Sequence, residues 1–153
     1  MAIIPKFRAS DFDKIAKEMI RRAEQAIISR FQLIGEEFVN SARSKTRDQG
    51  GFGNVTGNLR SSISYVILND GRTVLENIEK SGNGSEGVSA SRALIRELKG
   101  KYTKGYVLIV FAAMKYAAAV ESRGMDVITG SSLVAERSLR KAIEVIENKI
   151  AGR

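Results

Sequence analysis

The sequence predicts an α+β domain in which a small, mainly antiparallel sheet of about four strands packs against a long N-terminal helix and a C-terminal helix. Apolar residues recur with helical spacing near both ends of the chain, at residues 11–47 and 131–151. Between them, an Asn-Asp-Gly turn separates two strand-like runs, and residues 106–130 hold the most hydrophobic stretch. These observations place the sheet between two helices.

All 153 residues fit a single domain, because a chain of this length can bury a core without disulfides or metal. We divide the chain into an extended arm, a long helix, a sheet region with a hairpin and a short basic helix, and a C-terminal helix, at residues 1–10, 11–47, 48–130 and 131–151. No internal repeat or low-complexity segment stands out in this order.

The composition argues against catalysis, because the chain has no cysteine and no histidine. Thiol nucleophiles, Cys or His zinc sites, Ser-His-Asp triads and histidine acid–base chemistry are therefore excluded. Scattered carboxylates such as Glu121 and Asp126 remain, but no cluster of acids has the spacing of metal ligands. We predict a protein that is not an enzyme, with no catalytic, cofactor-binding or metal site.

The net charge of +8 fits either a polyanionic partner or an ordinary soluble domain. The apolar segment at the N-terminus is too short for a signal peptide, and no later run approaches the ~20 apolar residues of a membrane span. We therefore expect a soluble protein that is made in the cytoplasm and has no membrane contact.

Residues 1–10 are expected to be extended, because the residue before Pro5 is disfavoured in the helical region. Such an arm can dock on a neighbouring subunit, and a tail that folds back on its own domain or stays disordered fits equally well. Ser10 and Asp11 then provide an N-cap and an acidic first turn for the long helix.

The long helix carries one apolar stripe and would extend roughly 50 Å at ~1.5 Å per residue. Gly35 is a point at which it can bend. Most of the stripe is expected to face the core, although a helix of this length can also project toward another subunit. The stripe consists of Phe12, Ile15, Met19, Ala23, Ala26, Ile27, Phe31, Ile34, Phe38 and Ala42.

The glycine-rich loop at residues 48–54 lacks the lysine and Ser/Thr of a Walker A motif and follows a helix rather than a strand, so nucleotide binding is not predicted. Residues 56–63 favour one helical turn or a tight corner. A strand, a tight turn, a partner strand and a flexible linker are then expected at residues 64–68, 69–71, 72–78 and 81–87.

The basic part of the chain is a short helix, capped by Ser89 or Ser91, that ends near Gly100. Residues 92–104 contain one acid, Glu97, and five cations, namely Arg92, Arg96, Lys99, Lys101 and Lys104. These cations fit either a solvated helix end, where lysines complement the helix dipole, or contact with DNA phosphates. Sequence-specific readout of DNA is not expected, because no recognition-helix pattern accompanies them.

Two strands are predicted in the most hydrophobic stretch, a buried strand over Tyr106–Ala112 and another over residues 125–129. Ser131 and Ser132 can cap the last helix. Its apolar face consists of Ala135, Leu139, Ala142, Ile143, Ile146 and Ile150.

Three features occur together in order along the chain. An amphipathic N-terminal helix ends in a basic, glycine-containing loop; residues 56–63 read TGNLRSSI; and residues 115–124 read KYAAAVESRG. Over residues 12–150 this pattern resembles the tail-completion or neck proteins of long-tailed phages, with their T-G-x-L-x-x-S-I corner and Y-A-x-x-V-E-x-G stretch. Ser122 and Arg123 stand before Gly124, where that family usually has a Gly-Thr pair. This difference also fits a tail-terminator or another ring protein of the same assembly.

The resemblance implies a structural virion protein of the phage neck or tail that forms a homo-oligomeric ring, commonly a hexamer, around the DNA channel. The implied partners are other copies of the chain, connector or head-completion proteins, and tail-tube or tail-terminator proteins. Passing DNA would be contacted through nonspecific electrostatics. A tail-terminator ring protein and a sequence-nonspecific DNA-binding protein are the alternatives.

The candidate residues of a subunit interface lie in the two motifs: Arg60, Tyr116, Glu121 and Arg123. In one interpretation, Glu121 meets a basic residue such as Arg60 across a ring interface. In the other, Tyr116 packs at the sheet edge, and Glu121 caps or pairs within its own chain. The residues that would face DNA are the five cations of residues 92–104.

Overall fold

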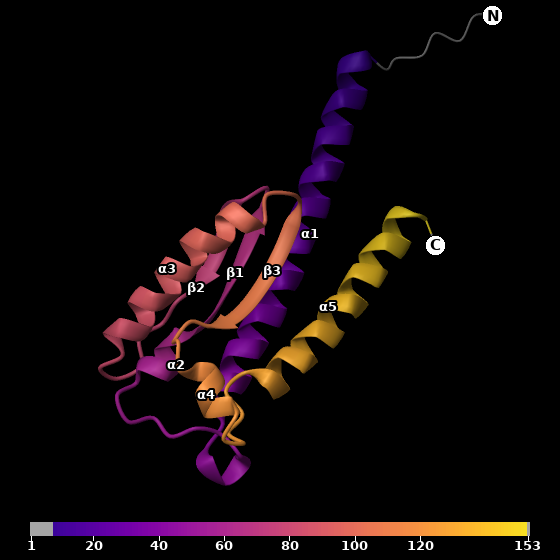
Figure 1. Ribbon diagram of the computed structural model, residues 1–153. Coiled ribbons are helices and arrows are strands. Elements are labelled where there is room, and N and C mark those ends of the chain that lie inside the picture. The colour runs from indigo at the N-terminus through magenta and orange to yellow at the C-terminus, as the bar shows by residue number, and fades with distance from the viewer. Residues whose placement is uncertain (1–7, 153) are drawn as a thin grey trace, which may run out of the picture.

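The computed structural model describes residues 8–152, which form a three-stranded antiparallel sheet covered by helices on both faces (Figure 1). The predicted α+β class is therefore confirmed, with three strands rather than about four. Most of the predicted arm, residues 1–7, lies outside the described residues. The elements are α1 (Ala9–Ser44), η1 (Arg47–Gln49), α2 (Asn58–Ser62), β1 (Ile63–Asn69), β2 (Arg72–Asn77), α3 (Ser85–Lys101), β3 (Tyr106–Ala112), α4 (Ala117–Glu121) and α5 (Thr129–Ile150).

Helix α1 begins one residue before the predicted cap, so Ser10 lies in its first turn and not at the N-cap. The first turn is closed instead by Asp11, whose Oδ2 accepts the Arg8 N–H at 3.0 Å. Gly35 does not interrupt the helix. A Cβ at this position would lie 2.6 Å from the ring of Tyr65, so glycine is needed here for the sheet to approach the helix closely.

The strand order is β2-β1-β3, with β1 in the centre and both pairings antiparallel. The predicted hairpin joins β1 to β2, and its turn residues Asp70 and Gly71 both have positive φ, at 47° and 75°. Asp70 Oδ1 also accepts the Gly105 N–H at 2.8 Å, which ties the turn to the start of β3. The turn is therefore in contact with both the hairpin strands and the start of β3.

Strand β1, not β3, is the buried strand. Every residue of β1 except Asn69 is buried, whereas in β3 only Phe111 is buried and the other residues are half-buried. The prediction of Tyr106–Ala112 as the buried strand was therefore wrong in its degree of burial. The reason is position: β1 is covered on both faces and hydrogen-bonded on both sides, while β3 forms one edge of the sheet.

Each face of β1 packs against a different helix (Figure 1). Tyr65 and Ile67 point into the larger cluster, together with Phe38 and other buried residues of α1. Val66 and Leu68, on the opposite face, pack against Ile95 of α3. The sheet is therefore the middle of three layers, with α5 lying beside α1 on the same side of the sheet.

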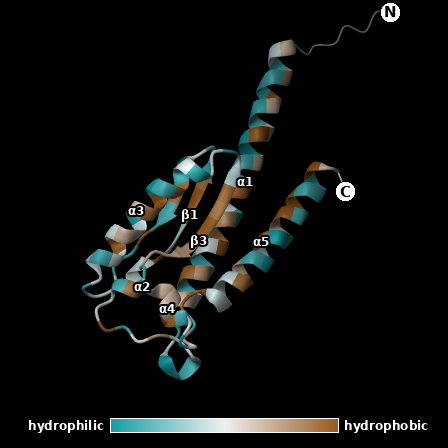
Figure 2. Cartoon of the chain, in the orientation of Figure 1, coloured by the Kyte–Doolittle hydropathy of each residue, from teal (hydrophilic) through white to brown (hydrophobic). Residues whose placement is uncertain are grey.

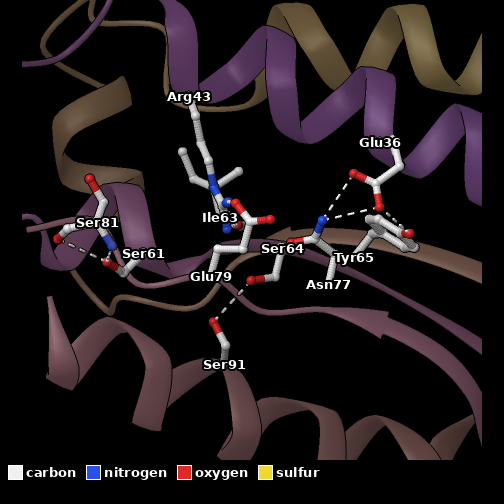
Figure 3. A network of polar contacts seen from close by, with 10 residues as sticks. All are labelled: Glu36, Arg43, Ser61, Ile63, Ser64, Tyr65, Asn77, Glu79, Ser81 and Ser91. Atoms are coloured by element: carbon white, nitrogen blue, oxygen red, sulfur yellow. Dashed lines mark hydrogen bonds and ion pairs between the residues drawn. The ribbon is translucent and has the colours of Figure 1, made fainter.

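Polar groups of α1 and the sheet form a network beside this core (Figure 3). Glu36 accepts hydrogen bonds from the Tyr65 hydroxyl at 2.8 Å and from Asn77 Nδ2 at 2.9 Å. Burial and the neighbouring carboxylate raise the pKa of Tyr65, so its phenol remains a hydrogen-bond donor at neutral pH. Arg43 binds the Ile63 carbonyl at 2.7 Å and Glu79 at 2.8 Å, which joins α1 to both ends of the hairpin.

The fourth strand predicted at residues 125–129 does not form. Asp126 makes one isolated bridge with Gly51, and Thr129 already begins α5. The backbone N–H groups of Ile128 and Thr129 both donate to Glu121 Oε1 at 2.9 Å, so they are not available to a strand partner. Val127 is buried in the core at 1% exposure, which accounts for the apolar character that suggested a strand.

Helix α3 begins at Ser85, earlier than the predicted caps Ser89 and Ser91, and takes up part of the predicted linker. Its first turns pack tightly on α2: a Cβ at Gly87 would lie 2.1 Å from the Asn58 carbonyl oxygen. Ser91 is fully buried and shares a hydrogen bond of 3.3 Å with Ser64 of β1. The small residues of this segment therefore serve close packing rather than flexibility.

Candidate subunit interface and basic surface

The first motif folds as a glycine-dependent corner before β1. Gly57 has φ of +82°, and a Cβ there would lie 2.0 Å from the Ser81 carbonyl oxygen, so only glycine fits. The Thr56 hydroxyl accepts the Asn58 N–H at 3.3 Å as α2 begins. Leu59 and Ser62 are buried and lead directly into β1. Residues 56–63 thus form the corner and the single helical turn that the sequence predicted.

The second motif forms α4 and a turn that ends at Gly124, whose φ is +81°. Its glutamate, Glu121, has a local role: Oε1 accepts the N–H groups of Ile128 and Thr129 and the Thr129 hydroxyl, at 2.9, 2.9 and 2.8 Å. Glu121 therefore caps the start of α5, a role predicted for Ser131 and Ser132. Ser131 instead bonds Ser41 of α1, and Ser132 bonds the Thr129 carbonyl.

Partial burial raises the pKa of Glu121, but the hydrogen bonds from Ile128 and Thr129 outweigh this effect, so the pKa of Glu121 lies below its usual value. The same balance holds at Asp126. Burial raises its pKa, but the ion pair with Lys45 and the hydrogen bond from the Gly130 N–H at 3.1 Å lower the pKa by more, so the pKa of Asp126 also lies below its usual value. Asp126 thus holds the start of α5 near the end of α1, and Glu121 holds it against α4.

The two motifs, far apart in the sequence, meet at one end of the molecule. Between them lies an open cavity of about 420 Å³, lined by residues of the first corner and of the second, including Phe52, Gly57, Tyr116 and Arg123. Arg47, from η1, also lines this cavity and was not among the predicted site residues. Its position follows from the Gly51–Asp126 bridge, which folds the loop after α1 against the second corner.

The four predicted interface residues lie around this region, but the structure brings only some of them together. Tyr116 and Arg123 line the cavity, and Tyr116 is 42% exposed. Arg60 is half-buried, with its guanidinium carbon 5.8 Å from the centre of the Phe52 ring. Within the described residues, Arg60 and Glu121 form no ion pair with each other.

The predicted basic residues are all exposed at the surface of α3 and the loop after it. Arg92, Arg96 and Lys99 are spaced by four and three residues, so they share one side of the helix, beside the buried Ile95. Lys101 pairs with Glu97 on its own helix, and the pKa of Lys101 is raised by that contact. Within residues 8–152, the other four cations of this segment, Arg92, Arg96, Lys99 and Lys104, form no ion pair.

A second surface, not predicted from the sequence, lies between α1 and α5. The two helices enclose an apolar groove of about 550 Å³, lined by Met19, Ala23 and Ala26 of α1 and by Ala142, Val145 and Ile146 of α5. The apolar stripes of both helices were the signal that could have revealed it, but helical spacing alone does not separate a buried stripe from an exposed one.

Residues 8–152 contain no group of three or more Asp or Glu side chains placed to hold a metal ion. No helix in the same part of the chain is long and apolar enough to cross a membrane. Comparisons with models of protein families, with curated proteins and with solved structures gave no significant match.

Proposed function

We propose that this chain is a structural subunit of the neck or tail of a phage virion, where copies of it form a ring, commonly a hexamer in proteins of this kind, between connector and tail. In this proposal the protein has no enzymatic activity. Its partners are further copies of itself and the connector, head-completion, tail-tube or tail-terminator proteins on either side. The ring surrounds the channel through which DNA passes.

The observation that carries this proposal is the meeting of the two motifs at one end of the molecule. Each motif depends on a glycine with positive φ, and together they border a cavity that their own chain leaves open. Val55 at its rim is 91% exposed, and Tyr116 and Arg123 are exposed beside it. Aromatic and arginine side chains around an open, partly apolar pocket are typical of protein interfaces.

The surface of α3 supports the DNA part of the proposal. Arg92, Arg96 and Lys99 lie on one exposed side of a helix that covers the face of the sheet opposite α1. In a ring, this side would face the channel and contact phosphates without reading the sequence. A few separate charges suit a conduit, because dense positive charge would hold the passing DNA too tightly.

The ring is tested by native mass spectrometry of the full chain over a range of concentrations. We expect a closed oligomer of about six copies, in line with the ring-forming proteins that the chain resembles. Arg123→Glu should remove it, because the substitution reverses a charge at the corner without altering a contact inside the subunit. Lys141→Glu, at an exposed position of α5, is the matched control. A chain that never exceeds a dimer would contradict the ring.

A free nucleic-acid-binding protein is the second candidate, because the exposed cations of α3 do not need a ring to contact phosphates. It predicts that the unassembled chain binds duplex DNA, with an affinity that falls steeply as salt rises. Charge reversal at Arg92, Arg96 and Lys99 should then flatten the salt dependence measured by fluorescence anisotropy. If the unassembled chain does not bind DNA, the second candidate is contradicted and any contact with DNA would require the ring.

A further inference from the structure

The N-terminal part of α1 projects beyond the rest of the domain (Figure 1). Positions 9–18 of α1 precede Met19, the first α1 residue that lines the groove between α1 and α5. The projecting segment, which we call the α1 tip, continues the apolar stripe into solvent: Ile15 is 55% exposed and Met19, at its base, is 66% exposed. Figure 2 shows hydrophobic turns on this part of α1 and on the end of α5 that lies nearest to it. The apolar face of the α1 tip is therefore exposed and lies outside the core of its own subunit.

The groove between α1 and α5 matches the α1 tip in length. Its α1 wall runs from Met19 to Arg30, which is roughly 17 Å at ~1.5 Å per residue. The tip, at positions 9–18, is roughly 14 Å long by the same measure of ~1.5 Å per residue. A second copy placed antiparallel to the first would therefore lay its tip along this groove, while its own groove receives the first tip.

The side chains also match in size along this antiparallel arrangement. The stripe is large at the tip, with Ile15 and Met19, and small near the body, with Ala23 and Ala26. Antiparallel pairing places the large residues of one copy against the small residues of the other, which is how closely packed helices fill the space between them. With Ile15 opposite Ala26, Met19 lies opposite Arg22 and next to Ala23 of the other copy.

Charge fixes the same register. The groove is bordered by Arg30 and Lys149, and within the described residues neither of them forms an ion pair. The tip begins with Asp11 and Asp13. Antiparallel positions that place Ile15 opposite Ala26 also place Asp11 opposite Arg30, because both pairs of residue numbers have the same sum. The acidic start of one tip thus meets the basic end of the other groove.

We propose that a second copy of this chain occupies the groove, so that two subunits pair through antiparallel α1 tips around a twofold axis. Each α1–α5 pair is itself antiparallel, so the contact builds a four-helix arrangement from two copies. The contact uses neither motif corner nor the basic side of α3. It therefore stands independently of the proposed ring, and the two can fail or succeed separately.

Cysteine crosslinking tests the register, because the chain has no cysteine of its own. In the variant carrying Ile15→Cys and Ala26→Cys, the two positions lie roughly 16 Å apart on one rigid helix, so they cannot bridge within a subunit. Under mild oxidation we expect covalent dimers to form at least tenfold faster than in a control variant carrying Ile15→Cys and Glu24→Cys. Glu24 is exposed and lies nine residues after Ile15, which places it on the opposite side of α1 from Ile15.

The mass of the unmodified assembly gives the second readout. In the Arg123→Glu variant, which lacks the proposed ring, sedimentation should show dimers that dissociate when Ile15→Ser and Met19→Ser are added, while Glu24→Ser leaves them intact. Asp11→Arg and Arg30→Asp should each weaken the dimer, and the two together should restore it, because the charges are exchanged and remain opposite. Equal crosslinking in both cysteine pairs, or a mass unaffected by the tip substitutions, would overturn the proposal.

Discussion

The two halves of α1 have the same apolar periodicity and opposite surroundings. In the C-terminal half, Phe31, Ile34 and Phe38 are 5% exposed or less, whereas in the N-terminal half Ile15 and Met19 are more than half exposed. The sheet and α5 cover the first group, and nothing within the described chain covers the second to a similar degree. The comparison teaches that periodicity identifies a packing face, while the length of the rest of the domain decides how much of that face is buried.

The largest effect is expected from truncating the buried half. Phe38→Ala should lower the free energy of unfolding by about 3–5 kcal/mol, because it removes a fully buried ring and leaves a cavity. Met19→Ala, in the exposed half, should change it by less than about 0.5 kcal/mol at dilute subunit concentration. Urea unfolding measures both. Similar losses for the two variants would mean that the tip is part of the subunit core.

A smaller effect is expected from filling the space beside Gly35. Gly35→Ala should cost about 1–3 kcal/mol, because the new methyl group would lie 2.6 Å from the Tyr65 ring, too close for a contact that can relax cheaply. Gly100→Ala is the matched control, since a Cβ in this exposed turn of α3 has nothing within 4 Å and should stabilise the protein by about 0.5–1 kcal/mol. Thermal unfolding of the two variants would show shifts of opposite sign.

The buried half of α1 also depends on the anchoring of α5. Glu121→Ala should destabilise the chain by about 1–2 kcal/mol, because the N–H groups at the start of α5 lose their acceptor. Ser132→Ala should be nearly neutral, although the sequence suggested Ser132 as a cap. Denaturant unfolding separates the two. An unchanged midpoint in the Glu121 variant would show that water replaces the carboxylate without loss.

The smallest expected effect is a dependence on acid pH. The folded-state pKa values of Glu121 and Asp126 lie below their ordinary values of 4.5 and 3.8, so the unfolded chain binds more protons as pH falls. The contribution of these two carboxylates to the free energy of unfolding is complete above about pH 5. It is lost as the pH falls through their ordinary pKa values toward the lowered pKa values of the folded state. The loss should be reduced in a variant carrying Glu121→Gln and Asp126→Asn. A pH profile identical to that of the natural chain would assign the acid sensitivity to other groups.

Much of the fold could be predicted because local signals agreed with the final structure. The local sequence predicted a tight turn at Asp70-Gly71 and a helix for each of the two terminal apolar stripes, without needing any information about tertiary contacts. The fourth strand failed for a different reason. Residues 125–128 are apolar because Val127 enters the core, but their backbone is directed by Glu121, a side chain several residues earlier whose role depends on tertiary contact.

The candidate site was predictable in part. The two corners were identified from their motifs, and the structure places Tyr116 and Arg123 at one cavity with Arg47. Arg47 was missed because its place there depends on a bridge between residues 51 and 126, which no local pattern encodes. Glu121 and Arg60 have separate surroundings within the subunit, so a test of the interface is better made at Arg123, where substitution leaves the internal contacts of the subunit intact.

The packing of α5 on α1 has a consequence for the order of folding during synthesis. The hydrogen bond between Ser41 and Ser131, at 3.0 Å, joins segments from opposite ends of the chain. A ribosome therefore releases α1 and the sheet well before the helix that completes their core, and such long-range contacts are slow to form. Until α5 emerges, Phe38 and its neighbours are covered by the sheet but lack their contact with α5, so this is the stage at which the newly made protein is most exposed to aggregation.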